Sequence, residues 1–162
     1  MSGVDGSRTA IERAVSRLSK ECPGWDADGE LLVGDMTSLS FSDALFDAVI
    51  DNEAIYSNSV EDSIKIYAEL ARILKPGGKL FSRMFATETW GYGTGQQVAY
   101  NTFIVSEGPM QGKGLSRFTA EKDIPLLTGS RFELDPLEWV QRSVEGGRHV
   151  IKEWIVTGTK HA

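Results

Sequence analysis

The chain has 162 residues, 41% of them hydrophobic, with 23 acidic and 17 basic side chains and a formal net charge of −6. These values describe one ordinary globular domain and exclude a disordered chain, a disulfide framework (Cys22 is the single cysteine) and a nucleic-acid partner. Because no apolar run approaches the ~20 residues of a membrane span and the first twenty residues carry no signal-peptide core, we expect a soluble, cytoplasmic protein without a membrane partner.

The first part of the chain alternates short apolar runs with helical stretches. Residues 3–5 are the end of an extended segment, and Ser7 can cap a helix that stops at residues 22–24, Cys-Pro-Gly. Residues 30–33 predict a short buried strand. Residues 46–51 predict a second strand, and its apolar character indicates cover on both faces.

A second helix is predicted to begin at Ser59, where Asp62 completes a sequence resembling a capping box. Pro76-Gly77-Gly78 stops this helix, and residues 79–85 form a third strand. Strands and helices that alternate through short connections imply a parallel sheet with right-handed crossovers. The predicted buried face of the helix consists of Val60, Ile64, Tyr67, Ala71 and Leu74.

The last part of the chain changes character. Residues 86–118 hold six glycines and no sustained period, so we expect a flexible loop that builds the substrate side. A short helix is predicted over 119–127. Residues 134–144 and 149–157 then flank Gly146-Gly147, which is a strong hairpin signal, so the chain closes on antiparallel strands.

Three predicted strands are each followed by an aspartate. Asp5, Asp35 and Asp51 occupy these positions, and ligands of open parallel sheets bind outside the carboxyl ends of the strands. A carboxylate there can accept hydrogen bonds from a ribose diol or from an adenine amino group. Turns favour Asp in any case, so one such residue is weak evidence, whereas three in consecutive strands are more specific.

Three segments resemble the class I S-adenosylmethionine-dependent methyltransferases: GVDGSRTAIERA, LLVGDMTSLSFSDALFDAVID and YAELARILKPGGKLF. The resemblance covers residues 3–85 closely and residues 119–158 by topology. It implies a Rossmann-like, three-layer α/β/α sandwich with an antiparallel C-terminal hairpin. It also implies an enzyme that uses S-adenosyl-L-methionine to methylate a small-molecule acceptor, which the sequence does not identify.

The resemblance assigns cofactor contacts to five residues. Asp5 matches the acid that binds the ribose. Gly34 and Asp35 match the turn whose acid accepts from the adenine amino group, and Met36 matches the apolar side chain against the adenine ring. Asp51 ends the strand where the family places residues beside the methionine part of the cofactor.

The substrate side is less well defined. Asn52, Glu53 and Tyr56 lie in the loop that faces the expected position of methyl transfer. Glu53 and Tyr56 are weak candidates for accepting a proton from the substrate, and solvation of the Glu53 loop is the competing interpretation. Trp90 and Tyr92 can form an aromatic substrate wall or can simply pack against the sheet.

One family element is absent. The family's first strand ends in a glycine-rich E/D-x-G-x-G-x-G turn, and this chain begins after it. We therefore expect residues 1–162 to form a single, truncated domain without that strand and its helix, in which cofactor binding can be impaired. Two inner strands then have unpaired edges, which a homodimer partner or an exchanged segment can fill. Residues 88–95, which contain GxGxG, are a weaker candidate for a permuted cofactor loop.

Two other functions remain open. A catalytically inactive remnant could serve as a binding or oligomerisation module. A nicotinamide-dependent oxidoreductase is disfavoured, because it also needs a glycine-rich first turn and has no use for the Gly34-Asp35-Met36 turn. Trp139 and Trp154 are interpreted as core or interface residues. His149 is interpreted as a surface residue without metal partners, so no metal site is expected.

Overall fold

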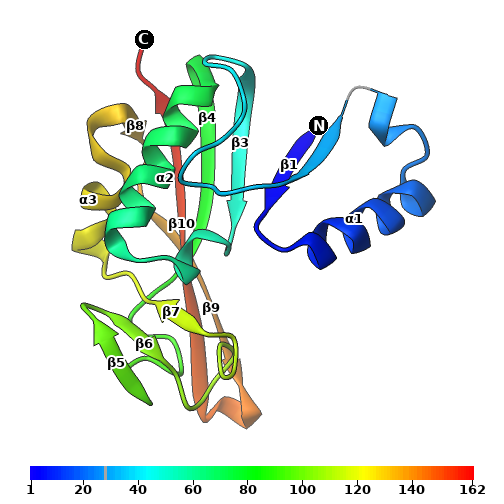
Figure 1. The fold of residues 1–162 in the computed structure, drawn as a ribbon. Coiled ribbons are helices and arrows are strands. Elements are labelled where there is room, and N and C mark those ends of the chain that lie inside the picture. The colour runs from blue at the N-terminus through cyan, green and yellow to red at the C-terminus, as the bar shows by residue number, and fades with distance from the viewer. Residues whose placement is uncertain (28) are drawn as a thin grey trace. The chain divides into compact units, whose positions relative to one another are not determined.

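In the computed structural model, residues 1–27 and 29–162 are described, and the chain divides into two units, Met1–Phe41 and Ser42–Ala162 (Figure 1). The first unit contains β1 (Ser2–Asp5), α1 (Arg8–Glu21), the 3-10 turn η1 (Trp25–Ala27) and β2 (Glu30–Val33). Strands β1 and β2 pair in parallel, with Asp5 opposite Val33.

The helix of the first unit begins where the sequence predicts. The Ser7 side chain accepts a hydrogen bond from the Ala10 backbone N–H at 3.3 Å, which satisfies one of the free donors at the helix start. Cys22 follows the last turn as its C-cap, and its thiol is free and exposed.

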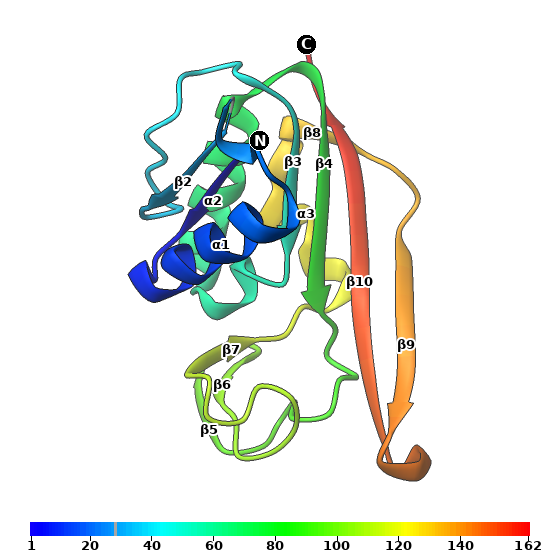
Figure 2. The same cartoon turned by 90° about the vertical axis from the view of Figure 1, so that its right-hand side faces the viewer.

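The second unit is built on a mixed five-stranded sheet in the order β3-β4-β10-β8, with β9 also paired to β10. Strands β3 and β4 are parallel, whereas β10 is antiparallel to each of its neighbours. Helices α2 and α3 cover one face of this sheet (Figures 1 and 2). The elements are β3 (Phe46–Asn52), α2 (Val60–Ile73), β4 (Leu74–Phe85), α3 (Ile124–Thr128), β8 (Phe132–Leu134), β9 (Glu138–Val144) and β10 (His149–Lys160).

Within the second unit, helices cover one face of strand β3 (Figures 1 and 2). Asp51 is 6% exposed on the face that α2 covers, whereas its neighbour Ile50 is 74% exposed. Side chains alternate between the two faces of a strand, and the helices of this unit lie on only one of them.

Helix α2 begins with the predicted capping box. The Ser59 Oγ accepts from the Asp62 backbone N–H at 3.0 Å and donates to the Asp62 carboxylate at 3.1 Å. The predicted buried face is partly wrong, because Ile64 is only half-buried and the core-facing stripe is rotated from the expected one. The buried residues of the helix are Ser63, Ile66, Tyr67, Leu70, Ala71 and Ile73.

The strand after α2 starts earlier than predicted. Strand β4 runs from Leu74, and Pro76-Gly77-Gly78 lies inside it instead of separating helix from strand. The register to β3 shifts here, because Phe46 pairs with Leu74 but Ala48 pairs with Lys79. Gly77 has φ 75°, so these residues form an irregularity that a left-handed glycine permits.

Residues 86–118 do not form the predicted irregular loop. They contain a three-stranded antiparallel sheet of β5 (Gln96–Ala99), β6 (Thr102–Ile104) and β7 (Leu115–Arg117). Its side chains join the long strands β4 and β10 in one hydrophobic cluster, and this burial orders a glycine-rich segment. The cluster consists of Phe85, Phe103, Val105, Met110, Phe118 and Ile151.

The C-terminal hairpin is confirmed. Strands β9 and β10 pair with His149 opposite Val144, and Gly146 and Gly147 take positive φ in the turn between them. Trp154 is buried in the core as predicted, whereas Trp139 is exposed on the hairpin. Where the chain is described, none of its helices has the length and apolar character needed to cross a membrane.

Candidate functional site

Two exposed aspartates stand at neighbouring strand ends in the first unit. Asp5 is the last residue of β1, and Asp35 follows β2 by two residues. The Gly34 backbone N–H donates to the Asp5 carbonyl oxygen at 3.1 Å, so the turn after β2 is tied to the end of β1. The structure therefore brings these two predicted residues together at the carboxyl edge of a parallel strand pair.

Local hydrogen bonds orient both carboxylates. One oxygen of Asp5 accepts from the Ser7 backbone N–H at 2.7 Å. One oxygen of Asp35 accepts from the Thr37 backbone N–H at 2.8 Å and from the Thr37 hydroxyl at 2.7 Å. Met36 stands between Asp35 and Thr37 in the sequence, and its side chain is half-buried. Both acids are thus held in turns while their side chains stay exposed.

Asp51 differs from the other two strand-end acids. Its Oδ1 accepts from the backbone N–H groups of Ala54 and Ile55, at 2.9 and 3.2 Å. Its Oδ2 accepts from the Ser82 hydroxyl at 2.6 Å, and the Ser82 Oγ in turn lies 2.7 Å from the Tyr67 hydroxyl oxygen. Burial raises the pKa of the Asp51 carboxyl. Oδ1 thus holds the loop after β3 and Oδ2 links β3 to β4, and the expected cofactor contact of this residue stays a prediction.

A second charged cluster lies where β3 and β4 end in the second unit. Arg83 Nη2 is 3.4 Å from the Glu53 carboxylate and forms an ion pair with Glu153 of β10. Arg83 Nη1 donates to the Asn52 side-chain oxygen at 3.3 Å. The Glu53 backbone N–H donates to the Arg83 carbonyl at 3.3 Å, and Glu53 has φ 60°, a left-handed conformation that is rare outside glycine.

The pKa values of Glu53 and Glu153 shift in opposite directions. Burial, together with the hydrogen bond and charge of Glu153, raises the pKa of Glu53 to about 7. Burial opposes ionisation of Glu153 too, but its hydrogen bonds with Glu53 and Arg83 outweigh it, and the pKa of Glu153 is lowered. Glu53 can therefore take up or release a proton near neutral pH while Glu153 stays charged. The Glu53 side chain is 27% exposed and contacts Arg83, so it is partly solvated and partly held by this cluster.

The aromatic candidates contact other side chains of the protein, although Tyr92 is 40% exposed. The rings of Tyr56 and Phe85 pack edge to face, with their centroids 5.0 Å apart. Burial, and to a smaller extent the charge of Glu53, raises the pKa of the Tyr56 hydroxyl. Trp90 stacks on His149 with ring centroids 3.9 Å apart. The Tyr92 hydroxyl donates to the Asn101 side chain at 2.9 Å. These contacts explain their positions, and a role of Trp90 or Tyr92 in binding substrate stays a prediction.

The sequence missed Arg83 and Glu153. Strands β4 and β10 bring them together through antiparallel pairing, with Arg83 opposite Ile155 and Glu153 opposite Phe85. No local signal distinguishes them, because β4 also contains Lys75 and Lys79, and β10 also contains Lys152 and Lys160. Within residues 1–27 and 29–162, no group of three or more His, Cys, Asp and Glu side chains is placed to hold a metal ion.

The GxGxG segment does not form a permuted cofactor loop. Strand β5 follows it, where such a loop needs a helix. A Cβ atom on Gly95 would lie 2.1 Å from the Ile104 carbonyl oxygen, and one on Gly91 would lie 2.8 Å from the Glu107 carbonyl oxygen. These glycines are required because the chain packs closely against its own backbone.

Comparison with protein families and curated proteins gives a consistent result. The family model described as "Methyltransferase domain" matches residues 1–82. A demethylmenaquinone methyltransferase of Renibacterium salmoninarum is 39% identical over 64 residues, which are 40% of this chain and 26% of that protein. A sterol 24-C-methyltransferase of Gibberella zeae is 37% identical over 79 residues, 48% of this chain and 19% of that protein. The matches thus span about a quarter or less of each relative.

Solved structures share the fold over nearly the whole chain. A SAM-dependent methyltransferase from Methanosarcina mazei matches 99% of this chain and 81% of its own, with a TM-score of 0.78 and 24% identity. The N-methyltransferase NodS from Bradyrhizobium japonicum, solved with S-adenosyl-L-homocysteine, matches 98% of this chain and 65% of its own, with a TM-score of 0.65 and 14% identity. At these identities the similarity concerns the fold.

Proposed function

This chain belongs to the class I S-adenosylmethionine-dependent methyltransferase family, and from that premise we propose that residues 1–162 act as one domain that binds the cofactor and methylates a small molecule. One observation supports cofactor binding above all. Asp5 and Asp35 stand, exposed and oriented, at the carboxyl ends of adjacent parallel strands, which is where ligands of open α/β sheets bind.

The hydrogen-bond acceptors at these strand ends fit the nucleoside part of S-adenosylmethionine. The Asp5 carboxylate can accept from the ribose hydroxyls, and the Asp35 carboxylate can accept from the adenine amino group. Gly34 presents no side chain between them, and the half-buried Met36 offers an apolar surface for the adenine ring. When bound, the cofactor supplies a methyl group that its sulfonium already activates.

We propose Glu53 as the proton acceptor. A nucleophile that carries N–H or O–H must lose a proton as it is methylated, and a base with a pKa near the working pH accepts it most effectively. Glu53 has that property, with a pKa of about 7 beside Arg83 and Glu153. Asn52 and Tyr56 flank it in the chain and are proposed to orient the acceptor. Trp90 and Tyr92 are proposed as further acceptor contacts.

The acceptor is proposed to be an organic small molecule, in the cytoplasm. The net charge of −6 disfavours a phosphate backbone as partner. The two curated relatives act, by their names, on demethylmenaquinone and on a sterol, which are both apolar organic molecules. The share of each relative that the chain matches is too small to transfer either substrate.

We also propose that an added strand completes the sheets. Among the strands that the structure describes, β1 pairs with β2 alone and β3 with β4 alone. Strands β1, β2 and β3 therefore each have one edge without a neighbouring strand, which favours pairing with another chain. A homodimer or an exchanged segment can provide such a strand.

Calorimetric titration with S-adenosyl-L-homocysteine tests the cofactor site. We expect binding to the unmodified chain, and a loss of about 10-fold to 100-fold in affinity for Asp5→Asn or Asp35→Asn, because each replaces a charged acceptor. Asp26→Asn is the matched control, since Asp26 lies in η1 at the amino end of β2.

Two outcomes contradict this proposal. Equal losses in all three variants mean that Asp5 and Asp35 do not contact the cofactor. Absence of heat at millimolar ligand supports the alternative, a catalytically inactive remnant that serves as a binding or oligomerisation module.

A further inference from the structure

The Asp51 carboxylate closes the turn that follows β3. Its Oδ1 accepts from the backbone N–H groups of Ala54 and Ile55, and these bonds tie the end of the strand to the start of the 3-10 turn η2 (Ile55–Ser57). Glu53 lies inside this closed turn and has φ 60°. A residue with a Cβ atom keeps such a conformation only where the surrounding contacts over-determine it. The two hydrogen bonds of Oδ1 are contacts of that kind.

The other oxygen of Asp51 is anchored in the core. Oδ2 accepts from the Ser82 hydroxyl of β4, and the Ser82 Oγ lies 2.7 Å from the Tyr67 hydroxyl oxygen of α2. Because Ser82 gives its one proton to Asp51, Tyr67 is the donor in the second bond. All three residues are buried. The carboxylate thus has two tasks, a link from β3 to β4 and α2 through Oδ2, and the closure of the turn through Oδ1.

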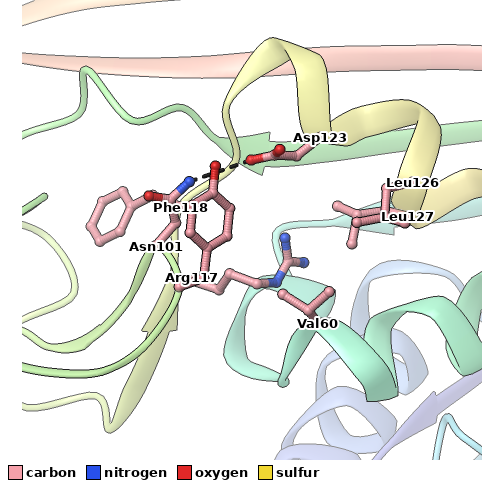
Figure 3. Close-up of a pocket in the computed structure, with 8 residues that line it drawn as sticks. Val60, Asn101, Arg117, Phe118, Asp123, Leu126 and Leu127 are labelled. Atoms are coloured by element: carbon pink, nitrogen blue, oxygen red, sulfur yellow. Dashed lines mark hydrogen bonds between the residues drawn. The ribbon is translucent and has the colours of Figure 1, made fainter.

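The nearby positive charge of Arg117 contributes little to Asp51. The Arg117 guanidinium is buried beside a small pocket at the start of α2 (Figure 3), and its Nη atoms donate to the hydroxyls of Thr119 and Ser63. Burial raises the pKa of Asp51, and the hydrogen bonds from Ser82 and from the turn oppose this more strongly than the charge of Arg117 does. Hydrogen bonds, and not an ion pair, therefore fix the position of this carboxylate.

The side chain that the turn presents is Glu53. Its carboxyl group is 3.4 Å from Arg83 Nη2 of β4, and the same nitrogen pairs with Glu153 of β10. The charge of Arg142 on β9 also acts on Glu53, and Glu53 in turn acts on the Tyr56 hydroxyl of η2. The Glu53 side chain is 27% exposed, so a turn without its closing bonds would release it into solvent.

We propose that Asp51 is a positioning residue for Glu53: its buried carboxylate holds the turn after β3 closed and so keeps the Glu53 carboxyl group beside Arg83 and Glu153. This inference rests on the proposed function of Glu53 as the proton acceptor. A general base must stand within hydrogen-bond reach of the proton that it takes. Asp51 therefore contributes to the reaction through Glu53, without contact with the reacting atoms.

The pKa of Glu53 is the quantity to measure. An NMR titration of the ¹³C-labelled 162-residue chain follows the Glu53 Cδ resonance, assigned by its loss in Glu53→Gln. We expect Asp51→Ala to lower the pKa of Glu53 from about 7 toward its ordinary value of 4.5, because the released side chain leaves Glu153 and becomes solvated. Asp51→Asn is expected to retain most of the shift, because its amide oxygen still accepts from Ala54 and Ile55.

Ser82→Ala is the matched control. It removes the link from β3 to β4 but leaves both hydrogen bonds of the turn in place. A purely structural role of Asp51 predicts that Ser82→Ala and Asp51→Ala lower the pKa of Glu53 equally. The positioning role predicts a clearly larger decrease for Asp51→Ala.

Four results overturn the proposal: a pKa of Glu53 that stays at about 7 in Asp51→Ala, an equal decrease in Asp51→Asn, an equal decrease in Ser82→Ala, or a wild-type pKa of 4.5. Asp51→Leu replaces the alanine variant if that variant does not fold, because its branched side chain fills the same space without an acceptor. If neither folds, Asp51 acts only in the core and the proposal is wrong. The titration contains no cofactor or acceptor, so its failure is distinct from a failure to bind S-adenosyl-L-homocysteine.

Discussion

The Glu53 carboxyl group has an unusual pKa because of partial burial, a backbone conformation and two contacts, with Arg83 and Glu153, that no local sequence pattern contains. Its backbone adopts φ 60°, which costs free energy for a residue with a Cβ atom. This conformation places the carboxyl group beside Arg83, which also pairs with Glu153 across the sheet. A strained residue in a coupled charge cluster is typical of a functional position, and this supports Glu53 as the proton acceptor.

The raised pKa of Glu53 predicts how stability depends on pH. Glu53 has a folded-state pKa of about 7 against 4.5 for the unperturbed group, so between these values the folded state binds more protons than the unfolded state. The contribution of Glu53 to stability is therefore complete below about pH 4.5 and is lost as the pH rises through 7. Glu53→Gln imitates the protonated form, so we expect this variant to gain stability relative to wild type between pH 5 and pH 8.

Urea unfolding at pH 5 and at pH 8 measures the difference in stability between Glu53→Gln and wild type. Glu121→Gln provides the baseline, because it makes the same substitution in the 3-10 turn η3 (Glu121–Asp123), outside the cluster. A stability difference between Glu53→Gln and wild type that is the same at pH 5 and pH 8 would disprove the raised pKa.

At the scale of elements, helix α2 shows how a local signal and tertiary packing cooperate. Its capping box satisfies a backbone donor at the first turn, and six of its residues are buried on the sheet or its neighbours. Helix α1 has a comparable serine cap but no buried residue. Loss of the α2 cap therefore weakens a helix on which the core of the second unit depends.

Ser59→Ala is expected to lower the free energy of unfolding by about 1 kcal/mol, the usual cost of losing such a cap. Chemical denaturation followed by circular dichroism measures it. Ser57→Ala serves as the control, since the exposed Ser57 hydroxyl donates only to the Ala54 carbonyl at 3.0 Å. A loss for Ser59→Ala no larger than that for Ser57→Ala would show that the cap has no energetic role.

At the scale of the whole molecule, the free edge of β3 is the feature with the largest consequence. The Glu53 N–H points to β4, where it donates to Arg83. Backbone groups alternate in direction along a strand, so the Ile50 N–H points to the free edge. Proline is tolerated at such a position and removes the donor. Ile50→Pro is therefore expected to abolish self-association without unfolding the second unit.

Sedimentation velocity over a concentration range from 1 to about 100 µM tests this expectation, with circular dichroism as the check on folding. Ile50→Lys keeps the backbone donor and adds a charge at the edge, so it should weaken association even where the proline variant fails to fold. A wild-type chain that stays monomeric throughout this range contradicts the proposed strand addition.

The sequence by itself determined the family, the cofactor and the elements that local patterns specify. The Ser7 and Ser59 caps, the turn after β2 and the Gly146-Gly147 hairpin depend on residues close together in the chain, and each appears where it is predicted. The same spacing placed Asp5 and Asp35 at neighbouring strand ends, because parallel strands align their carboxyl ends.

The tertiary structure alone decided which groups are available and which are enclosed. Asp51 ends a strand as Asp5 does, but the position of Ser82 on β4 turns its carboxylate into the interior. Glu53 and Glu153 meet only because β10 pairs with β4, and Arg117 is buried only because the segment between β4 and α3 folds onto α2. Strand register and burial bring together residues that are far apart in the chain, and a pattern within a short stretch of sequence cannot predict such pairs.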